Sequence, residues 1–284
     1  MIDRPTSTAQ IITLAPPADD LLQRLTYDGE TILRETPELT ALVLRIVRDA
    51  PTFEDAVARR SAMRLDSRDV PAQTILNAFH RAFADDPSIC VAIGADANAI
   101  LARDPAATRI IEAVLFFKGF HAIQTHRLAH WLWNNDGRDF ALYLQSRSSQ
   151  VFQTDIHPAA SFGRGIFLDH ATGLVVGATA VIEDDVSILH SVTLGGTGKD
   201  QGDRHPKIRQ GVLIGAGAKI LGPIEVGRNS RIAAGSVVLR SVSPDTTVAG
   251  IPAKPVGSSG SVKPSHQMDQ MLGPEAYDAF TYII

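Results

Sequence analysis

Two side chains that together could provide general-base catalysis, Asp155 and His170, are fifteen residues apart in the sequence. An aspartate that accepts a hydrogen bond from histidine fixes the imidazole tautomer and leaves the other ring nitrogen to remove a proton. In coils of about eighteen residues, the two would lie near each other on neighbouring coils, displaced by half a face. The alternative, an aspartate and a histidine in solvated turns, stays open.

Further polar residues occupy places where a purely structural segment would carry small or apolar ones. Asp169 precedes His170, and Arg204 and His205 lie in a stretch that interrupts the repeat described below. Asp104 precedes a proline, a pair typical of a helix start, where the carboxylate caps the helix. From spacing alone, we expect Asp104 to have this capping role.

Two other patterns have structural explanations. The glycine-rich stretch 195–200 lacks the spacing of a phosphate-binding loop, and its glycines allow a ligand to approach the backbone closely. His126 and His130 are four residues apart on an expected helix, but no third metal ligand is evident nearby. Packing therefore explains His126 and His130 better than metal binding does. His190 stands alone in the sequence, and we assign it no role.

A repeat of six residues in the second half of the chain predicts the elements that position these side chains. Its period fits neither a helix nor a flat strand and indicates the hexapeptide repeat of a parallel β-helix. Two residues are added after Leu168, and the period fails between Leu194 and Ile208, where we expect the chain to loop out. The repeated apolar residues are Ile156, Phe162, Leu168, Val176, Ile182, Ile188, Leu194, Ile208, Ile214, Ile220, Val226, Ile232 and Val238.

The first half of the chain has helical periodicity. Apolar residues recur at intervals of three and four from about Leu21 to Gln153, and Asp20 can cap the first helix. A long apolar segment runs from Ile110 to Trp133 and ends at the turn signal 134–137. We therefore expect an all-helical region that joins the β-helix without a flexible linker.

The two periodicities predict three regions of the chain. A helical domain covers residues 1–153, the β-helix covers 154–256, and a flexible tail covers 257–284. Glycine and serine over 257–261 are typical of a linker and could carry the tail away from the β-helix.

Composition limits the classes of protein and the compartment. The 284 residues have a formal net charge of -4, which offers no basic face for nucleic acid. A single cysteine, Cys90, cannot form an internal disulfide and suggests a reducing compartment. The first residues lack the order of a signal peptide, and no apolar run reaches the ~20 residues of a membrane span. We expect a cytoplasmic protein.

Several segments of the chain resemble the serine O-acetyltransferases. Hexapeptide repeats alone would indicate only a broad acyltransferase superfamily, but here they accompany a helical domain, Asp-His pairs and an Arg-His pair. The resemblance runs from about Ile100 to Lys254. The segments that carry it are 117–122 (FKGFHA), 130–133 (HWLW), 155–160 (DIHPAA), 168–173 (LDHATG), 192–199 (VTLGGTGK) and 203–207 (DRHPK).

The resemblance implies an architecture and an assembly. It implies a left-handed β-helix with three faces per coil, although the usual crossover rule would favour the right hand. It further implies that three β-helices associate side by side with active sites between subunits. Two such trimers would pair through the helical domains to give a homohexamer.

The resemblance also implies transfer of acetyl from acetyl-CoA to the hydroxyl of L-serine, with roles for individual residues. His170 would be the base, oriented by Asp155. Arg204 and His205 would hold the substrate carboxylate, and Asp104 and Asp169 would lie near its ammonium group. For Asp104 this role is added to the expected cap.

The same resemblance implies how the co-substrate acetyl-CoA is held, with no metal and no other cofactor. The pantetheine arm would lie beside Gly196, Ala216 and Ala234, and Arg231 would meet a CoA phosphate. A backbone N–H near Gly196 would stabilise the oxyanion.

Two further ligands follow from the resemblance. L-Cysteine, nearly isosteric with serine, would compete for the same site and act as a feedback inhibitor of cysteine synthesis. The terminal Ile284 would enter the active site of O-acetylserine sulfhydrylase, with its carboxylate bound there.

Three alternatives stay open from the sequence. A metal-dependent hydratase like the γ-class carbonic anhydrases would use His157, His170 and His205 as zinc ligands between subunits. A related O-acetyltransferase would act on homoserine or another hydroxyl compound. A scaffold protein would recruit partners through its tail.

Overall fold

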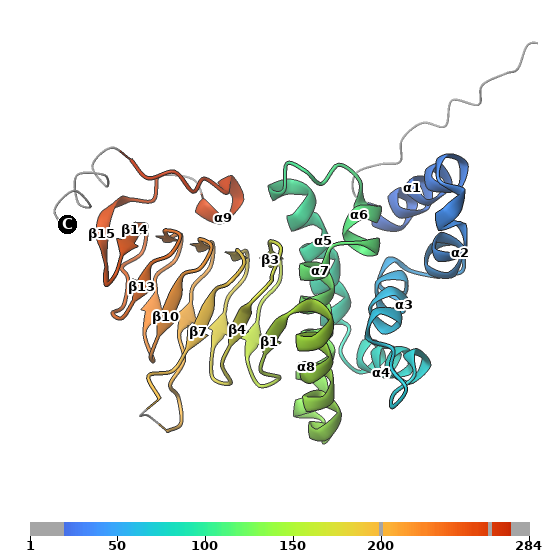
Figure 1. The fold of residues 1–284 in the computed structure, drawn as a ribbon, viewed down its shortest axis with the longest axis horizontal. Coiled ribbons are helices and arrows are strands. Elements are labelled where there is room, and N and C mark those ends of the chain that lie inside the picture. Colours follow the sequence, from blue (N-terminus) through green and yellow to red (C-terminus); the bar gives the residue numbers. More distant parts are fainter. Residues whose placement is uncertain (1–19, 199–200, 261–262, 274–284) are drawn as a thin grey trace, which may run out of the picture.

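The computed structural model describes residues 20–198, 201–260 and 263–273. Helices form one end of the molecule, and stacked coils of short strands form the other (Figure 1). The expected fold class, a helical N-terminal region followed by a left-handed parallel β-helix, is confirmed. Among the described residues, no helix is both long and apolar enough to cross a membrane.

The helical region begins where the sequence predicts, because Asp20 accepts a hydrogen bond from the backbone N–H of Gln23 at 2.9 Å. The apolar segment 110–133 is divided into two helices at Phe116 and Phe117, whose backbones leave the helical region. The helices are α1 (Leu21–Glu35), η1 (Pro37–Leu39), α2 (Thr40–Val43), η2 (Leu44–Arg48), α3 (Phe53–Leu65), α4 (Ala72–Asp85), α5 (Ser88–Arg103), α6 (Ile110–Leu115), α7 (Lys118–Asn134) and α8 (Arg138–Phe152).

The β-helix follows α8 after a single residue, Gln153, in left-handed conformation (φ 60°). Its strands form three sheets, in the orders β1-β4-β7-β10-β13, β11-β8-β5-β2 and β15-β14-β12-β9-β6-β3. The strands are β1 (Thr154–Ile156), β2 (Ser161–Phe162), β3 (Phe167–Leu168), β4 (Leu174–Val176), β5 (Val181–Ile182), β6 (Ser187–Ile188), β7 (Thr193–Gly195), β8 (Lys207–Ile208), β9 (Leu213–Ile214), β10 (Lys219–Leu221), β11 (Glu225–Val226), β12 (Arg231–Ile232), β13 (Val237–Val238), β14 (Thr246–Gly250) and β15 (Ala253–Ser258).

The apolar residues of the six-residue repeat lie in these strands and fill the core of the β-helix. Parallel pairing joins equivalent positions of successive coils, for example Leu168 with Ile188 and Ile188 with Ile214. The two added residues after Leu168 and the interruption after Leu194 lie in turns between strands, so the register of the core is kept.

A buried ion pair fastens the helical region to the first coil. The carboxylate of Asp96, on α5, is fully buried and accepts hydrogen bonds from Arg127 and Gln124, on α7, and from the backbone N–H of Ile166. Arg127 also donates to the carbonyl oxygen of Gly163 at 2.8 Å. A buried network of hydrogen bonds therefore joins the helices to the β-helix.

The described part of the segment 257–261 does not have the structure of a linker. Gly257 and Ser258 end β15, which pairs antiparallel with β14, and Ser259 is buried and donates to the carbonyl of Asn229 at 2.6 Å. After residues 261–262, the short helix α9 (Pro264–Gln267) packs against the β-helix, and Ser187 donates to the carbonyl of Ser265. Small polar residues here satisfy backbone hydrogen bonds.

Candidate active site

The predicted site residues divide mainly between the two edges of the sheet formed by β1, β4, β7, β10 and β13. We call the turns that lead into its strands the entry turns: residues 169–173, 189–192, 215–218 and 233–236. The exit turns follow its strands and comprise 157–160, 177–180 and 196–198 with 201–206. In Figure 1, the interrupted segment leaves the lower edge of this sheet, and α9 lies above its upper edge.

The first entry turn carries Asp169 and His170. His170 has a left-handed backbone (φ 55°), and its side chain is 74% exposed, so the imidazole projects from the β-helix. Nε2 of His170 lies 3.7 Å from a carboxylate oxygen of Asp169. Burial raises the pKa of the Asp169 carboxyl, and the neighbouring Asp104 carboxylate adds to that shift, whereas His170 opposes it.

Asp104 and Asp169 line the same hollow, of about 470 Å³, together with Phe167 and residues of the segment 266–270. Arg103 also lines it, but its guanidinium is paired with Asp185. The expected helix cap at Asp104 is wrong. Asp104 follows the last residue of α5, and the next helix begins only at Ile110, so Asp104 does not start a helix. Its carboxylate instead accepts a hydrogen bond from the backbone N–H of Ala106 in the turn between the two helices. Two neighbouring carboxylates make this hollow suited to a cationic group.

Asp155 lies on β1 with its side chain exposed, opposite Val175 in the sheet. Its carboxylate accepts a hydrogen bond from the side chain of Gln145 at 2.6 Å. Among the described residues, no hydrogen bond joins Asp155 to His170. The orienting role of Asp155 therefore stays a prediction.

The exit turns hold Arg204 and His205 through Thr179. The hydroxyl of Thr179 accepts the backbone N–H groups of both residues, at 3.0 and 3.1 Å. The His205 ring packs directly on Gly177, where an added Cβ would overlap the ring atoms. Sequence reasoning missed Thr179 and Gly177, because neither residue type nor spacing indicates a contact that depends on the interrupted segment.

His205 is positioned as a neutral hydrogen-bond donor. Its Nδ1 accepts from the backbone N–H of Thr179 at 3.2 Å, which leaves the proton on Nε2. Burial lowers the pKa of His205, and the cations Arg204 and Lys207 lower it further. In the part of the chain that the structure describes, the Arg204 guanidinium makes no hydrogen bond or ion pair, so this turn offers two donors to an anion.

The predicted CoA residues also occupy both edges. Ala216 and Ala234 lie in the entry turns of later coils, at equivalent positions, because the N–H of Gly235 donates to the carbonyl of Ala216 just as the N–H of Gly217 donates to the carbonyl of His190. Gly196 lies in an exit turn, where an added Cβ would come within 3.3 Å of Arg204. Arg231, on β12, pairs with Asp269 at 3.3 Å and donates to the hydroxyl of Thr247.

One protomer does not bring the two groups of predicted serine-binding residues together. The strands β4 and β7 separate the entry turns from the exit turns, and three extended residues span roughly 10 Å. Asp104, Asp169 and His170 lie on the entry side, and Arg204 and His205 lie on the exit side. Ile284 lies outside the described residues.

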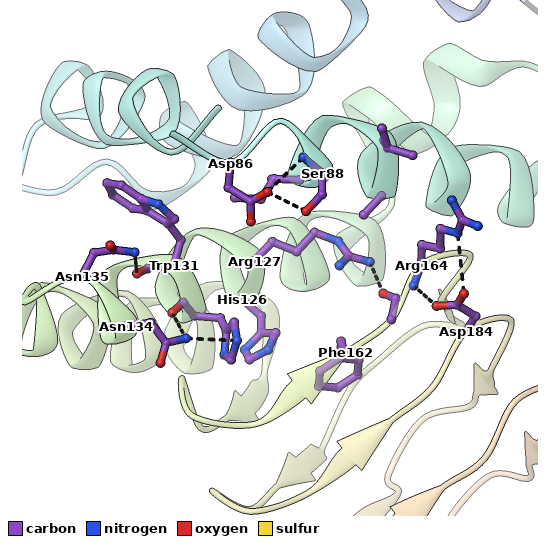
Figure 2. A pocket seen from close by; sticks show the side chains of 15 residues that line it. Asp86, Ser88, His126, Arg127, Trp131, Asn134, Asn135, Phe162, Arg164 and Asp184 are labelled. Carbon is purple, nitrogen blue, oxygen red and sulfur yellow. Dashed lines mark hydrogen bonds and ion pairs between the residues drawn. The ribbon is translucent and has the colours of Figure 1, made fainter. Parts of the chain in front are cut away.

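Another pocket, with a volume of about 570 Å³, lies between α5, α7 and the first coils (Figure 2). It contains none of the predicted site residues. Its charged side chains already have partners among the described residues: Arg127 pairs with Asp96, Arg164 pairs with Asp184, and Asp86 accepts hydrogen bonds from Ser88. This pocket is therefore not where the predicted catalytic and binding residues lie.

The histidines of the hydratase alternative are likewise divided. His157 and His205 lie in exit turns, whereas His170 lies in an entry turn. Within the described ranges of one protomer, no group of three or more His, Cys, Asp or Glu side chains is arranged to hold a metal ion.

Both the helical region and the β-helix contain segments that match models of known protein families. Residues 21–125 match the family model described as "Serine acetyltransferase, N-terminal", and residues 205–240 match "Bacterial transferase hexapeptide (six repeats)". The chain is 58% identical over 215 residues to the serine acetyltransferase of Salmonella typhimurium, an alignment that covers 76% of this chain and 79% of the relative.

Solved structures agree with this assignment. The serine acetyltransferase of Brucella abortus in complex with coenzyme A matches with a TM-score of 0.84 and 56% identity, covering 85% of this chain and 97% of the other. A serine acetyltransferase in complex with cysteine matches with a TM-score of 0.87 and 44% identity, covering 89% and 98%.

Proposed function

Because the chain belongs to the serine acetyltransferases, a family of acyltransferase enzymes, we propose that it forms O-acetyl-L-serine from acetyl-CoA and L-serine for cysteine synthesis. The observation that carries the proposal is the exposed His170 beside the acidic hollow of Asp104 and Asp169. An imidazole and an ammonium site side by side are what the hydroxyl and amino groups of serine require.

His170 is the general base. As the serine hydroxyl attacks the thioester carbon, its proton passes to the imidazole, and a tetrahedral intermediate forms. The carbon–sulfur bond then breaks, and the proton passes from the imidazolium to the CoA thiolate. Asp155 orients the ring and stabilises its charged form.

Two copies of the chain supply the two ends of the serine site. Asp104 and Asp169 of one protomer bind the ammonium group, and Arg204 and His205 of its neighbour bind the carboxylate. The separation of these groups on opposite edges of one sheet supports this arrangement. We propose side-by-side trimers that pair into hexamers through their helical domains, a closed symmetric assembly.

CoA lies along the entry turns of one protomer. Ala216 and Ala234 carry small side chains that leave room for the pantetheine arm, and Gly196 of the neighbour closes the other side. Arg231 exchanges its ion pair with Asp269 for a phosphate group of CoA. The complex of the Brucella abortus relative with coenzyme A supports acetyl-CoA as the co-substrate.

L-Cysteine occupies the serine site as a feedback inhibitor. It has the same ammonium and carboxylate groups as serine, and its thiol replaces the hydroxyl. The complex of a relative with cysteine supports binding of this ligand. We further propose that the terminal Ile284 docks in O-acetylserine sulfhydrylase through its free carboxylate. A tail peptide with an amidated end lacks this carboxylate and should therefore bind the sulfhydrylase more weakly than the free acid.

The test of the function is release of CoA thiol from acetyl-CoA with different acceptors. L-Serine should saturate the enzyme, whereas L-homoserine, D-serine and buffer alone should give little release. A preference for homoserine would identify the related acyltransferase instead. Zinc at one equivalent per site with no thiol release would identify the hydratase, and no activity with any acceptor would favour a scaffold.

A further inference from the structure

We propose that Lys118 is a positioning residue, which holds the turn that carries His170 through a hydrogen bond to Thr172. The inference rests on the proposed function, because the position of His170 matters to catalysis only if His170 is the base. Lys118 lies in the segment 117–122, to which sequence reasoning assigned no chemical role.

The turn that carries His170 differs from the other entry turns. It has five residues, 169–173, whereas each of the other three has four. Three of its residues, His170, Ala171 and Gly173, are left-handed, with φ of 55°, 57° and 73°, whereas each of the other entry turns has one left-handed residue. Residues other than glycine rarely adopt this conformation and keep it only where surrounding contacts hold them.

Lys118, the first residue of α7, supplies such contacts. Its Nζ donates to the hydroxyl of Thr172 at 2.5 Å and to the side-chain oxygen of Gln153 at 3.2 Å. The backbone N–H of Thr172 donates to the carbonyl of His170 at 2.8 Å, and that of Gly173 donates to the carbonyl of Gln153 at 2.8 Å. One ammonium group therefore contacts both the turn and the residue that supports it.

The start of the turn is fixed by the next residue of α7. A Cβ at Gly119 would come within 2.0 Å of the carbonyl oxygen of Leu168, so the helix backbone lies directly against the residue before the turn. Gly119 thus holds the beginning of the turn, and Lys118 holds it near its end. Between these two contacts lies His170, whose side chain is 74% exposed and therefore depends on its backbone for its position.

A lysine at the first position of a helix also departs from local preference. The N-terminus of a helix carries partial positive charge, which favours acidic residues and disfavours cations. The first turn of α7 has no acidic residue, and no side chain caps this end of the helix. Such departures from local preference are expected mainly at functional sites. The contact with Thr172 gives this lysine a function that helix formation does not.

Two other roles for Lys118 would give different results. A cation at this place could bind the serine carboxylate or a CoA phosphate, and its loss would then raise KM for that substrate. A lysine that only fastens α7 to the first coil would affect unfolding but not the kcat of the folded enzyme.

The test removes the contact from either side. Lys118→Met keeps the length of the side chain without the donor, and Thr172→Val keeps the shape of threonine without the hydroxyl. We expect each to lower kcat by about tenfold or more, because small displacements of a reacting group cost at least that much. KM values for serine and acetyl-CoA should stay within about threefold of wild type.

Three controls accompany these variants. Thr172→Ser keeps the hydroxyl and should have kcat near wild type. Arg81→Met removes an exposed cation on α4 and should leave kcat unchanged. The variant with both Lys118→Met and Thr172→Val should be no slower than the slower single variant, because the two changes remove one interaction.

A further readout tests whether Lys118 acts through His170. In the His170→Ala background, Lys118→Met should cause no additional loss of turnover, because the base that Lys118 positions is already absent. A substrate-binding lysine would instead add its own loss in that background.

Three results would overturn the assignment: wild-type kcat in Lys118→Met, a rise in KM with unchanged kcat, or a full additional loss in the His170→Ala background. If Lys118→Met does not fold, Thr172→Val compared with Thr172→Ser decides the question, and equal kcat in those two variants would also overturn it. An inactive wild type would instead reject the proposed function itself.

Discussion

At the scale of single residues, His205 shows how the fold holds a predicted binding side chain. The ring is buried, Thr179 accepts the backbone N–H and donates to Nδ1, and Gly177 provides the space. Residue types in the sequence identify Arg204 and His205 as candidates. The contacts that fix them come from two turns far apart in the chain, so no local pattern predicts them.

Gly177→Ala tests this contact. The added methyl would overlap the His205 ring and displace it, without a left-handed backbone angle to strain. We expect kcat/KM for serine to fall by about tenfold or more, since small displacements of a binding group cost at least that much. Binding of CoA, measured by calorimetry, should be unchanged. Unaltered serine saturation would show that His205 does not contact serine.

Burial of His121 predicts a dependence of stability on pH. The side chain is fully buried on α7 beside Ser61, and burial, together with Arg64 and Arg60, holds its pKa well below the ordinary value of about 6.5. The unfolded chain therefore takes up a proton near pH 6.5, whereas the folded chain does not. Stability that is complete above this pH falls as the pH decreases, by up to about 1.4 kcal/mol per unit.

His121→Gln removes this titrating group. The variant should lose less stability than wild type between pH 7 and pH 5, although its stability at pH 7 is lower. Urea unfolding followed by circular dichroism at several pH values gives both numbers. Equal slopes in the two proteins would mean that His121 takes up its proton as readily in the folded chain as in the unfolded one.

At the scale of elements, the sequence predicts the β-helix in more detail than the helical region. Each apolar residue of the six-residue repeat lies in a strand, because every face of a coil contributes one apolar side chain to the narrow core. The break between α6 and α7 is not readable from apolar content. It depends on α7 packing so closely on the first coil that a Cβ at Gly119 would overlap the Leu168 carbonyl.

The junction between the two regions depends on Asp96. Replacing it with alanine would leave Arg127 buried without its anion, which costs about 3–5 kcal/mol. We expect Asp96→Ala to lower the melting temperature and to weaken the contact between α7 and the first coil. Alanine at the exposed Asp139 is the matched control and should change stability by less than about 0.5 kcal/mol. Equal melting temperatures for the two variants would contradict the account.

At the scale of the whole molecule, the proposed serine site requires more than one copy of the chain. The helices and the β-helix of one protomer place Asp104 and His170 on the entry side but leave Arg204 and His205 on the exit side. The six-residue periodicity predicts the coils of one protomer but not how protomers associate. The proposed assembly rests on the family resemblance and on this separation of the acidic and basic binding residues.

Mixed assemblies test the shared site. His170→Ala and Arg204→Ala should each be nearly inactive alone. After the two are unfolded and refolded together, about a quarter of the sites should combine an intact His170 with an intact Arg204 of the neighbour. Activity should recover towards that fraction. No recovery, with trimers confirmed by size-exclusion chromatography, would place the whole site in one protomer.

The most direct test of the central claim is the turnover of His170→Ala, measured as CoA thiol release with saturating L-serine and acetyl-CoA. The account predicts a loss of roughly a hundredfold or more, because the serine hydroxyl loses its base. CoA affinity, measured on the same preparation, should stay near that of wild type, since the imidazole acts on the acceptor proton. Turnover near wild type in the folded variant would contradict the assignment of His170 as the base.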